Sequence, residues 1–396
     1  MLRFRRFADA FFEASSGFTS AGLSMVDRPS LLPRTIMFWR SFTQWIGGLG
    51  IITFMYNFFT MQKASLQLYY HDRDLAEALP DIELNIRKLG WMYLGFTASC
   101  ILGLWLAGRP LWEAINHGMT AVVTGGFSIT DNSLAGYNWP QRLVVIFFMI
   151  IGALHFDVFY KTFRHKTLKY LVKEPQILYF MATLLLLCLL ALFELWYFNK
   201  NDLLADSLFM MVSALTTTGF STTTLAGWPV ALLMLIIAGM FIGGTSNSTA
   251  GGIKTFRFIT LLEGTIVAEV LMMFRAGRHF HSDSSGKQMG VQGIRKLYQN
   301  VAMFVLTWSL VLVICIYLLL HNVPEVFSLP DVIFESISAI STVGLSAGVT
   351  TDDLNITAKI IFSLMMIIGR TELIPLLLIS ALLFKKNYDI SGERES

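Results

Sequence analysis

One short motif occurs four times in this chain of 396 residues, and its spacing restricts the folds that the chain can adopt. Each copy reads Ser or Thr, any residue, Gly, Phe or Leu, and Ser. The copies lie at residues 20–24, 124–128, 217–221 and 342–346. An acidic residue stands thirteen positions before the glycine of each copy: Asp9, Glu113, Asp206 and Asp331. Successive copies are about a hundred residues apart, far more than the length of a solenoid repeat, so each belongs to a module of its own.

The composition predicts that these modules lie in a membrane. Hydrophobic residues make up 54% of the chain and charged residues 14%. Several apolar runs approach the roughly 20 residues that cross a bilayer as a helix. We predict spans at 31–59, 89–108, 141–163, 176–198, 229–274, 297–321 and 356–384. The fifth run is too long for one simple crossing, and the composition as a whole is not that of a soluble domain.

The distribution of Lys and Arg predicts the orientation of the spans. Residues 63–88, 161–173, 254–296 and 385–394 carry most of the positive charge, whereas the loops between these regions carry little. Short cytoplasmic loops are enriched in Lys and Arg. The basic regions are therefore placed in the cytoplasm, and the four motifs open toward the outside.

A short amphipathic stretch precedes each motif and is too short to span the bilayer. Residues 112–122 and 204–215 are the clearest examples. We expect each stretch to re-enter the membrane as a helix whose carboxyl end directs negative partial charge toward the motif. The glycine permits backbone angles that a side chain forbids, so successive carbonyls can turn to one axis and replace the water shell of a cation.

The four motifs together predict an ion filter. One copy alone would be a polar loop between helices, but four in register favour a common pore, where irregular backbone is tolerated at membrane depth. The predicted filter residues are Ser20, Ala21, Gly22, Thr124, Gly125, Gly126, Thr217, Thr218, Gly219, Thr342, Val343 and Gly344. The predicted ion ligands are the backbone carbonyls of Ser20, Ala21, Thr124, Gly125, Thr217, Thr218, Thr342 and Val343.

Beyond the motifs, the chain resembles the membrane subunits of the Trk/Ktr/HKT superfamily of potassium transporters, especially the bacterial TrkH type. The resemblance covers nearly all of the chain and is most specific at residues 38–50 (FWRSFTQWIGGLG), 153–156 (ALHF) and 369–372 (GRTE). It implies an all-α polytopic membrane protein with four pseudo-repeated span/pore-helix/filter/span modules around one central pore. It also implies a homodimer in the bilayer, a cytoplasmic nucleotide-binding RCK-type subunit similar to TrkA, and a place in the bacterial cytoplasmic (inner) membrane.

The four modules are expected at residues 1–60, 61–170, 171–276 and 277–396, the last with a short cytoplasmic tail. Met1 falls just before the first re-entrant stretch, so we expect module 1 to lack the first span that the family pattern has. One alternative that follows is a non-conducting, amino-terminally truncated form.

An interruption in the third module is a candidate gate. Its ten small or polar residues have apolar sequence on both sides: Gly243, Gly244, Thr245, Ser246, Asn247, Ser248, Thr249, Ala250, Gly251 and Gly252. Broken helices of this kind line transport pathways, and the resemblance implies a movable intramembrane loop below the filter. The alternative is an ordinary loop between two helices. A phosphate-binding loop is excluded, because Ile253 separates the last glycine from Lys254.

Arg370 is the second gate candidate, because a charge inside the apolar run 360–383 should face protein or a water-filled cavity. The resemblance implies that Arg370 lies below the filter and opposes cation passage. The alternative is a structural ion pair, for example with Glu372. Arg40 and Gln44 can contact a filter carbonyl or a carboxylate, or support packing.

The leading functional hypothesis is potassium uptake, with potassium as the only bound cofactor. The alternative is a sodium-permeable or mixed cation transporter, but the resemblance links sodium passage to a serine in place of a filter glycine, and all four positions here are glycine.

An enzyme is disfavoured because the spans contain no HExxH pair, no Ser/His/Asp group and no cysteine cluster. The net charge of +3 forms no basic stripe for nucleic acid. Coupling to protons or sodium, and the nucleotide that the partner senses, stay open.

Overall fold

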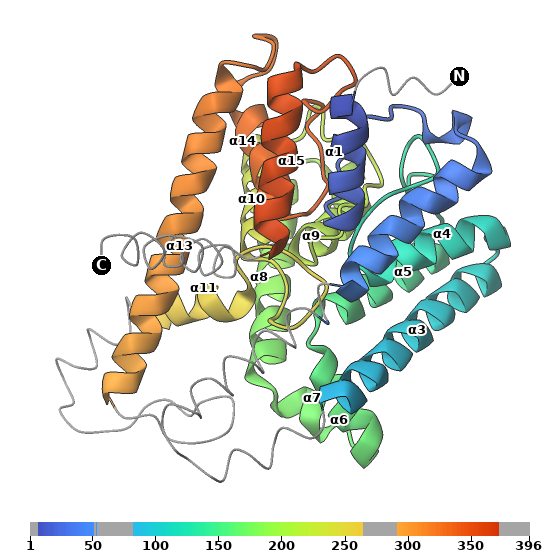
Figure 1. Ribbon diagram of the computed structural model, residues 1–396, viewed down its shortest axis with the longest axis vertical. Helices are drawn as coiled ribbons and strands as arrows, with labels where there is room; N and C mark the ends of the chain where they lie inside the picture. The colour runs from blue at the N-terminus through green and yellow to red at the C-terminus, as the bar shows by residue number, and fades with distance from the viewer. Residues whose placement is uncertain (1–6, 51–52, 54–81, 264–290, 372–396) are drawn as a thin grey trace, which may run out of the picture.

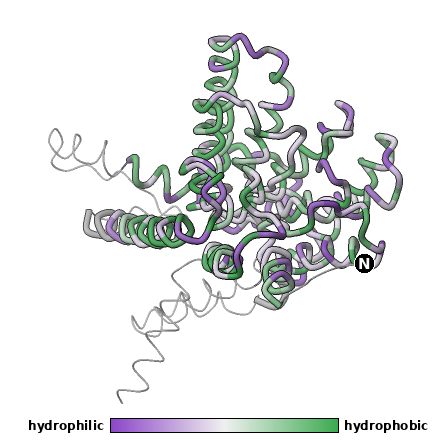
Figure 2. The backbone as a smooth tube through the Cα atoms, turned by 90° about the horizontal axis from the view of Figure 1, so that it is seen from above, coloured by the Kyte–Doolittle hydropathy of each residue, from purple (hydrophilic) through white to green (hydrophobic). Residues whose placement is uncertain are grey.

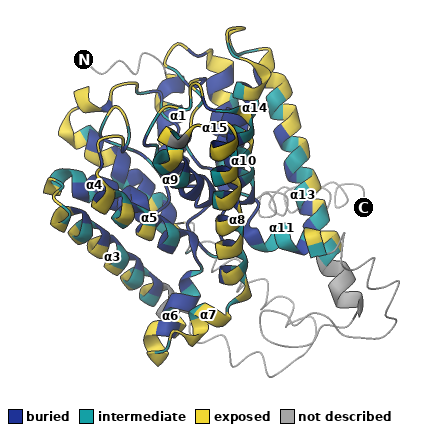
Figure 3. Ribbon diagram, turned by 180° about the vertical axis from the view of Figure 1, so that it is seen from behind, coloured by how far each residue is buried: buried dark blue, intermediate teal, exposed yellow. Residues whose placement is uncertain are grey.

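The computed structural model describes residues 7–50, 53, 82–263 and 291–371. Its regular elements are helices joined by turns and irregular segments, and no strand occurs among the described residues. Three helices are long and apolar enough to cross a membrane: α3 (Ile82–Leu106), α8 (Pro175–Tyr197) and α13 (Val291–Leu320). They confirm helices at the predicted spans 89–108, 176–198 and 297–321. Figure 2 shows long hydrophobic stretches along the backbone, and Figure 3 shows many exposed residues on these three helices, as expected of surfaces that face lipid.

Four short helices confirm the predicted amphipathic stretches, each ending two residues before its motif. They are α1 (Phe7–Phe18), α4 (Leu111–Val122), α9 (Leu204–Leu215) and α14 (Leu329–Ile340), with twelve residues apiece. Twelve residues give a helix of roughly 18 Å, which is too short to cross a bilayer. The second halves of α4, α9 and α14 are buried, and that of α1 is buried except at Ala14 and Phe18. We call the four helices the pore helices.

A further helix follows each motif: residues 34–50, α5 (Trp139–Ala153), α10 (Val230–Ile242) and α15 (Ile356–Thr371). The pore helix α4 packs against α3 and α5, α9 packs against α8 and α10, and α14 packs against α13 and α15. The pore helix α1 packs against α15, beside which it lies in Figure 1. Two 3₁₀ turns, η1 (Pro29–Leu31) and η3 (Asn201–Leu203), connect these elements.

Two predicted spans are not single straight helices. Over 141–163, α5 ends at Ala153 and α6 (Phe156–His165) leaves at 98°; α7 (Lys169–Lys173) follows. Over 229–274, α10 ends at Ile242 and α11 (Thr255–Leu262) begins after the predicted interruption. The carbonyls of Gly152 and Ala153 accept hydrogen bonds from Thr249 and Thr245, and these contacts end α5. The remainders of 31–59, 229–274 and 356–384 lie mostly outside the described residues.

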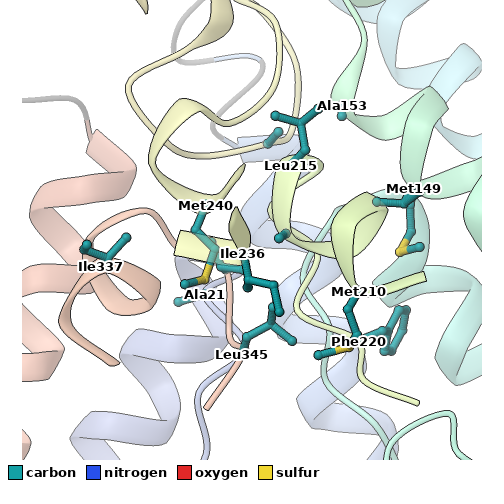
Figure 4. Packing of buried hydrophobic residues seen from close by; sticks show 14 of the residues in the cluster. Ala21, Met149, Ala153, Met210, Leu215, Phe220, Ile236, Met240, Ile337 and Leu345 are labelled. Carbon is teal, nitrogen blue, oxygen red and sulfur yellow. The ribbon is translucent and has the colours of Figure 1, made fainter. Parts of the chain in front are cut away.

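The helices meet in one hydrophobic core that draws on all four motif regions. Its members include Ala21, Met149, Phe220 and Leu345, and Figure 4 shows side chains from α5, α9, α10 and α14 converging there. Each of these four residues is at most 2% exposed. The core therefore holds the four motifs against one another.

Candidate functional site

All four motifs have the same backbone hydrogen bonds at the end of their pore helix. In the first copy, the N–H of Ser20 donates to the carbonyl of Gly17, and the N–H of Ala21 donates to the carbonyl of Ser16. The equivalent bonds, three and five residues back, recur at Thr124 and Gly125, Thr217 and Thr218, and Thr342 and Val343. This is the Schellman arrangement that satisfies the last carbonyls of a helix.

The first residue of each motif occupies the left-handed region that a Schellman end requires. The φ angles of Ser20, Thr124, Thr217 and Thr342 are 49°, 53°, 53° and 50°. Glycine is the usual residue at this position, and a β-branched residue there is strained. Threonine occupies this strained conformation in three of the four motifs. The threonine side chain, or the direction in which its backbone carbonyl points, therefore outweighs the cost in stability.

The four motif glycines form a closed ring of close contacts. A Cβ atom added to Gly22 would lie within 3.0 Å of the carbonyl oxygen of Gly125, and one added to Gly126 would be as close to that of Thr218. The same holds for Gly219 against Val343, and for Gly344 against Ala21. Each glycine thus faces the carbonyl of the next motif, and the fourth faces the first.

The glycines also have φ angles between 76° and 94°. Their conformation favours glycine, and their contacts leave no room for any side chain. Among the described residues, a cavity of about 880 Å³ is lined by all four motif glycines and by the last serine of each motif: Ser24, Ser128, Ser221 and Ser346.

The acids that precede the motifs all have partners. Asp9 accepts from Lys359 at 2.6 Å, Glu113 pairs with Arg109 at 3.2 Å, and Asp206 pairs with Arg142 at 2.9 Å. Asp331 instead forms a capping box with Ser328 at the start of α14. These carboxylates therefore hold the outer ends of the pore helices in place.

A second position, which sequence reasoning missed, lies nine residues before each motif glycine and is polar in three of the four copies. Glu13 accepts from Ser24 Oγ at 2.7 Å and from the N–H of Met25 at 2.6 Å, and Arg40 donates to it at 3.2 Å. In the second copy, His117 Nε2 lies 3.0 Å from Ser128 Oγ. We call this the bracing position. Its sequence signal is a constant offset of eleven residues from the last serine.

The other two copies differ at the bracing position. Glu335 accepts from Ser346 Oγ, the N–H of Ala347 and both the N–H and Oγ1 of Thr350, at 2.5 to 3.1 Å. The third copy has Met210, and there Ser213 Oγ donates to the carbonyl of Phe220 at 2.7 Å. Each motif is therefore braced from its own pore helix: by a glutamate in the first and fourth copies, by His117 in the second and by Ser213 in the third.

Arg40 and Gln44, for which the sequence left packing and polar roles open, both reach the second motif. Gln44 Nε2 donates to the carbonyl of Gly125 at 2.6 Å, and its Oε1 accepts from the N–H of Phe127 at 3.1 Å. Arg40 donates to the carbonyl of Ser128 as well as to Glu13. The helix that follows one motif thus supports the next.

Residues 243–252 form an irregular segment that packs directly against the motifs. Thr249 Oγ1 lies 3.2 Å from Thr124 Oγ1, the N–H of Gly251 donates to Thr217 Oγ1 at 2.6 Å, and the N–H of Gly252 donates to the carbonyl of Ser341 at 3.2 Å. We call this segment the inner loop. Most of it is buried, so it is not an ordinary surface loop.

The second gate candidate contacts the inner loop. Arg370, which is 7% exposed near the end of α15, donates through Nη1 to the carbonyl of Thr249 at 2.5 Å. Asn247 Nδ2 lies 3.1 Å from Nε2 of His155, at the bend between α5 and α6. Glu372 lies outside the described residues. The two predicted gate elements, far apart in the sequence, are thus brought together.

Comparisons with known proteins show the family of the chain. The family model TrkH, described as "Cation transport protein", matches residues 3–388. An uncharacterized cation transporter of Methanocaldococcus jannaschii is 32% identical over 387 residues, which is 96% of this chain and 77% of that protein. The Trk system potassium uptake protein TrkH of Vibrio parahaemolyticus is 30% identical over 389 residues, 94% of this chain and 78% of that protein.

The folds also agree. The crystal structure of the potassium transporter TrkH from Vibrio parahaemolyticus superposes with a TM-score of 0.80 at 28% identity, covering 94% of this chain and 78% of the other. These relatives are named as transporters rather than enzymes. The chain therefore belongs to the TrkH family of cation transport proteins.

Proposed function

We propose that this chain carries potassium across a membrane through a filter formed by its four motifs. The observation that carries this proposal is the closed ring, in which each motif glycine faces the carbonyl of the next motif. The cavity lined by all four glycines supports an entry on the outer side. Relatives of similar sequence are named potassium uptake proteins of Trk systems.

The chemistry of the filter is electrostatic. Backbone carbonyls of the first two residues of each motif replace the hydration shell of the cation. The carboxyl ends of the four pore helices add negative partial charge at the same place. The hydroxyls of Ser20 and Thr342 are buried and have no hydrogen-bond partner among the described residues, so they are available to an ion or to water in the path.

The inner loop and Arg370 form the gate in this proposal. The inner loop bonds to the motif region at Thr124 and Thr217, and these contacts support a position across the cytoplasmic side of the filter. Arg370 adds a positive charge there and holds the carbonyl of Thr249. Opening requires these hydrogen bonds to break together, so the closed state is held by several contacts of moderate strength.

We also propose a homodimer in the inner membrane and a cytoplasmic nucleotide-binding subunit of the RCK type that moves the inner loop. Support comes from the names of the relatives, which assign them to Trk systems. A sodium-permeable or mixed cation path is the second candidate, and the four motif glycines favour potassium over it.

Transport by the purified chain in lipid vesicles tests the proposal. Gly344→Ser should reduce potassium flux strongly or relax its selectivity over sodium, because the new side chain meets the carbonyl of Ala21. Gly348→Ser is the matched control: Gly348 has nearly the same φ, 93° against 94°, but a Cβ there meets nothing within 4 Å. Equal flux and selectivity in both variants would contradict the filter assignment.

A further inference from the structure

The segment from α6 through α7 differs from the other helices in its direction and in its surface. α6 leaves α5 at 98° instead of continuing in its direction. Figure 1 shows α6 and α7 together at the end of the molecule where α3 and α8 begin, and Figure 3 shows exposed residues along α7 and on one side of α6. We call residues 156–173 the lateral segment.

The inner face of the lateral segment anchors it to α3. Phe156 and Phe159 are buried, and their rings lie 6.1 and 5.2 Å from that of Phe96. The ammonium group of Lys88 lies 5.2 Å from the centroid of the Tyr160 ring. Because Lys88 lies at the start of the apolar window of α3, this contact places the segment at the level where the span begins.

The outer face of the lateral segment combines apolar and basic side chains. Phe163, Leu168 and Val172 are 60%, 70% and 76% exposed. Five lysine and arginine residues of the segment are also exposed: Lys161, Arg164, Lys166, Lys169 and Lys173. Asp157 and Glu174, the acids at the two ends, are both less exposed. An amphipathic helix with this mixture typically lies in the interface of a bilayer.

The surface of α8 makes the contrast clear. Its exposed side chains include Leu178, Leu185 and Leu189, and no basic residue lies among residues 175–197. A uniformly apolar surface suits the hydrocarbon interior, whereas long basic side chains reach the level of lipid headgroups. The lateral segment therefore meets a different layer of the membrane from that which surrounds α8.

From this geometry and charge we infer that the lateral segment is a binding surface for anionic phospholipid. Its apolar side chains enter the acyl region, and Lys161, Arg164 and Lys169 bind the phosphate-containing headgroups. Basic residues near an anionic leaflet each add to the attraction, which falls with ionic strength. The bound lipid would fix α6 and, through the bend at residues 154–155, the end of α5.

The test measures lipid binding to the full chain by native mass spectrometry, with phosphatidylglycerol and phosphatidylcholine of the same acyl chains. The wild type should prefer phosphatidylglycerol. A triple variant, Lys161→Gln with Arg164→Gln and Lys169→Gln, should lose that preference by about 100-fold at low ionic strength. The charge-preserving variant Lys161→Arg with Lys169→Arg should keep it.

The control removes the same number of exposed charges elsewhere, as Arg28→Gln with Arg34→Gln and Lys200→Gln. This control should keep the lipid preference, and thermal unfolding should show that both triple variants are folded. Leu168→Asn with Val172→Asn should weaken the binding of both lipids, which a site for free phosphate would not show. Retention of the preference in the first triple variant, or its equal loss in the control, would overturn the inference and leave protein docking as the use of this surface.

Discussion

The first and fourth motif regions begin from the same sequence pattern and end in different electrostatic environments. Both pore helices read Asp-Xaa-Xaa-Phe-Glu-Xaa-Xaa-Ser, from Asp9 and from Asp331. Oε2 of Glu13 lies 3.2 Å from Nε of the Arg40 guanidinium. Glu335 occupies the same bracing position but receives hydrogen bonds only from hydroxyl and amide groups within the part of the chain that the structure describes. The local sequence determines the pore helix and the position of its glutamate. A distant residue, Arg40, determines whether the charge of that glutamate is neutralised.

The difference extends to the outer ends of these helices. Asp9 is held by Lys359, a residue of α15, whereas Asp331 caps its own helix through Ser328. The first motif region is therefore tied down by two ion pairs to other helices, and the fourth is mostly tied down by its own loop. Removal of one partner of an ion pair should therefore destabilise the first motif region more than the loss of a comparable hydrogen bond destabilises the fourth.

The largest effect on stability is expected at the Glu13 and Arg40 pair. Arg40→Gln leaves a buried carboxylate without its cation, and the loss of one partner of a buried pair costs about 3–5 kcal/mol of unfolding free energy. Thermal or denaturant unfolding in detergent measures this cost. The double variant with Glu13→Gln should recover a large part of it. A double variant no more stable than Arg40→Gln would show that the pair has no special coupling.

Glu335→Gln should destabilise the protein less than Arg40→Gln does. The substitution removes acceptor capacity but leaves no charged partner behind, so the expected cost is about 1–3 kcal/mol. The same unfolding assay, run in parallel, compares the two variants. If Glu335→Gln proves the more damaging one, an unpaired charge is not the source of the contrast.

If the four motifs form the proposed filter, the contrast should also appear in transport, because a carboxylate beside the cavity favours the entry of cations. Its partner Ser346 lines the outer cavity. Glu335→Gln should raise the potassium concentration for half-maximal uptake by about fivefold, as expected for loss of one nearby charge at intermediate dielectric. Glu13→Gln combined with Arg40→Gln conserves the local net charge and should leave that concentration nearly unchanged. Equal shifts in the two variants would remove the electrostatic distinction.

The smallest effect is expected at the outer end of α14. Ser328→Ala removes a capping hydroxyl and should cost about 1 kcal/mol, typical of a lost N-cap. In the first motif region, Lys359→Met leaves Asp9 buried without its cation, and this substitution should cost more unfolding free energy than Ser328→Ala. The unfolding midpoints of the two variants give the order directly, and the reverse order would mean that α1 is not held through Lys359.

The sequence predicted the features that depend on local chemistry. The motif glycines stand where positive φ and close approach exclude side chains, and the four pore helices follow from amphipathic stretches with an acid near their start. The interruption at 243–252 was visible because ten small or polar residues cannot continue an apolar helix. Whether these residues form a filter and a gate stays a prediction.

The features that sequence missed depend on contacts between distant residues. The apolar run 141–163 reads as one span, but its helix ends where the carbonyls of Gly152 and Ala153 bond to threonines more than ninety residues later. The bracing position was overlooked because no single residue type recurs there in all four copies: two are glutamates, and the others are His117 and Met210. The partner of Asp9 lies too far along the chain for spacing to indicate it.

The contact between Asp9 and Lys359 sets an order of events during synthesis. The two residues are 350 positions apart, and a ribosome that adds about 5–20 residues per second needs about 20–70 s to make the second after the first. Throughout that interval the first pore helix has been made but α15, against which it packs, has not. The contacts that hold α1 in the ring of motifs can therefore form only after α15 has been made, and Asp9 is without its partner Lys359 throughout that interval.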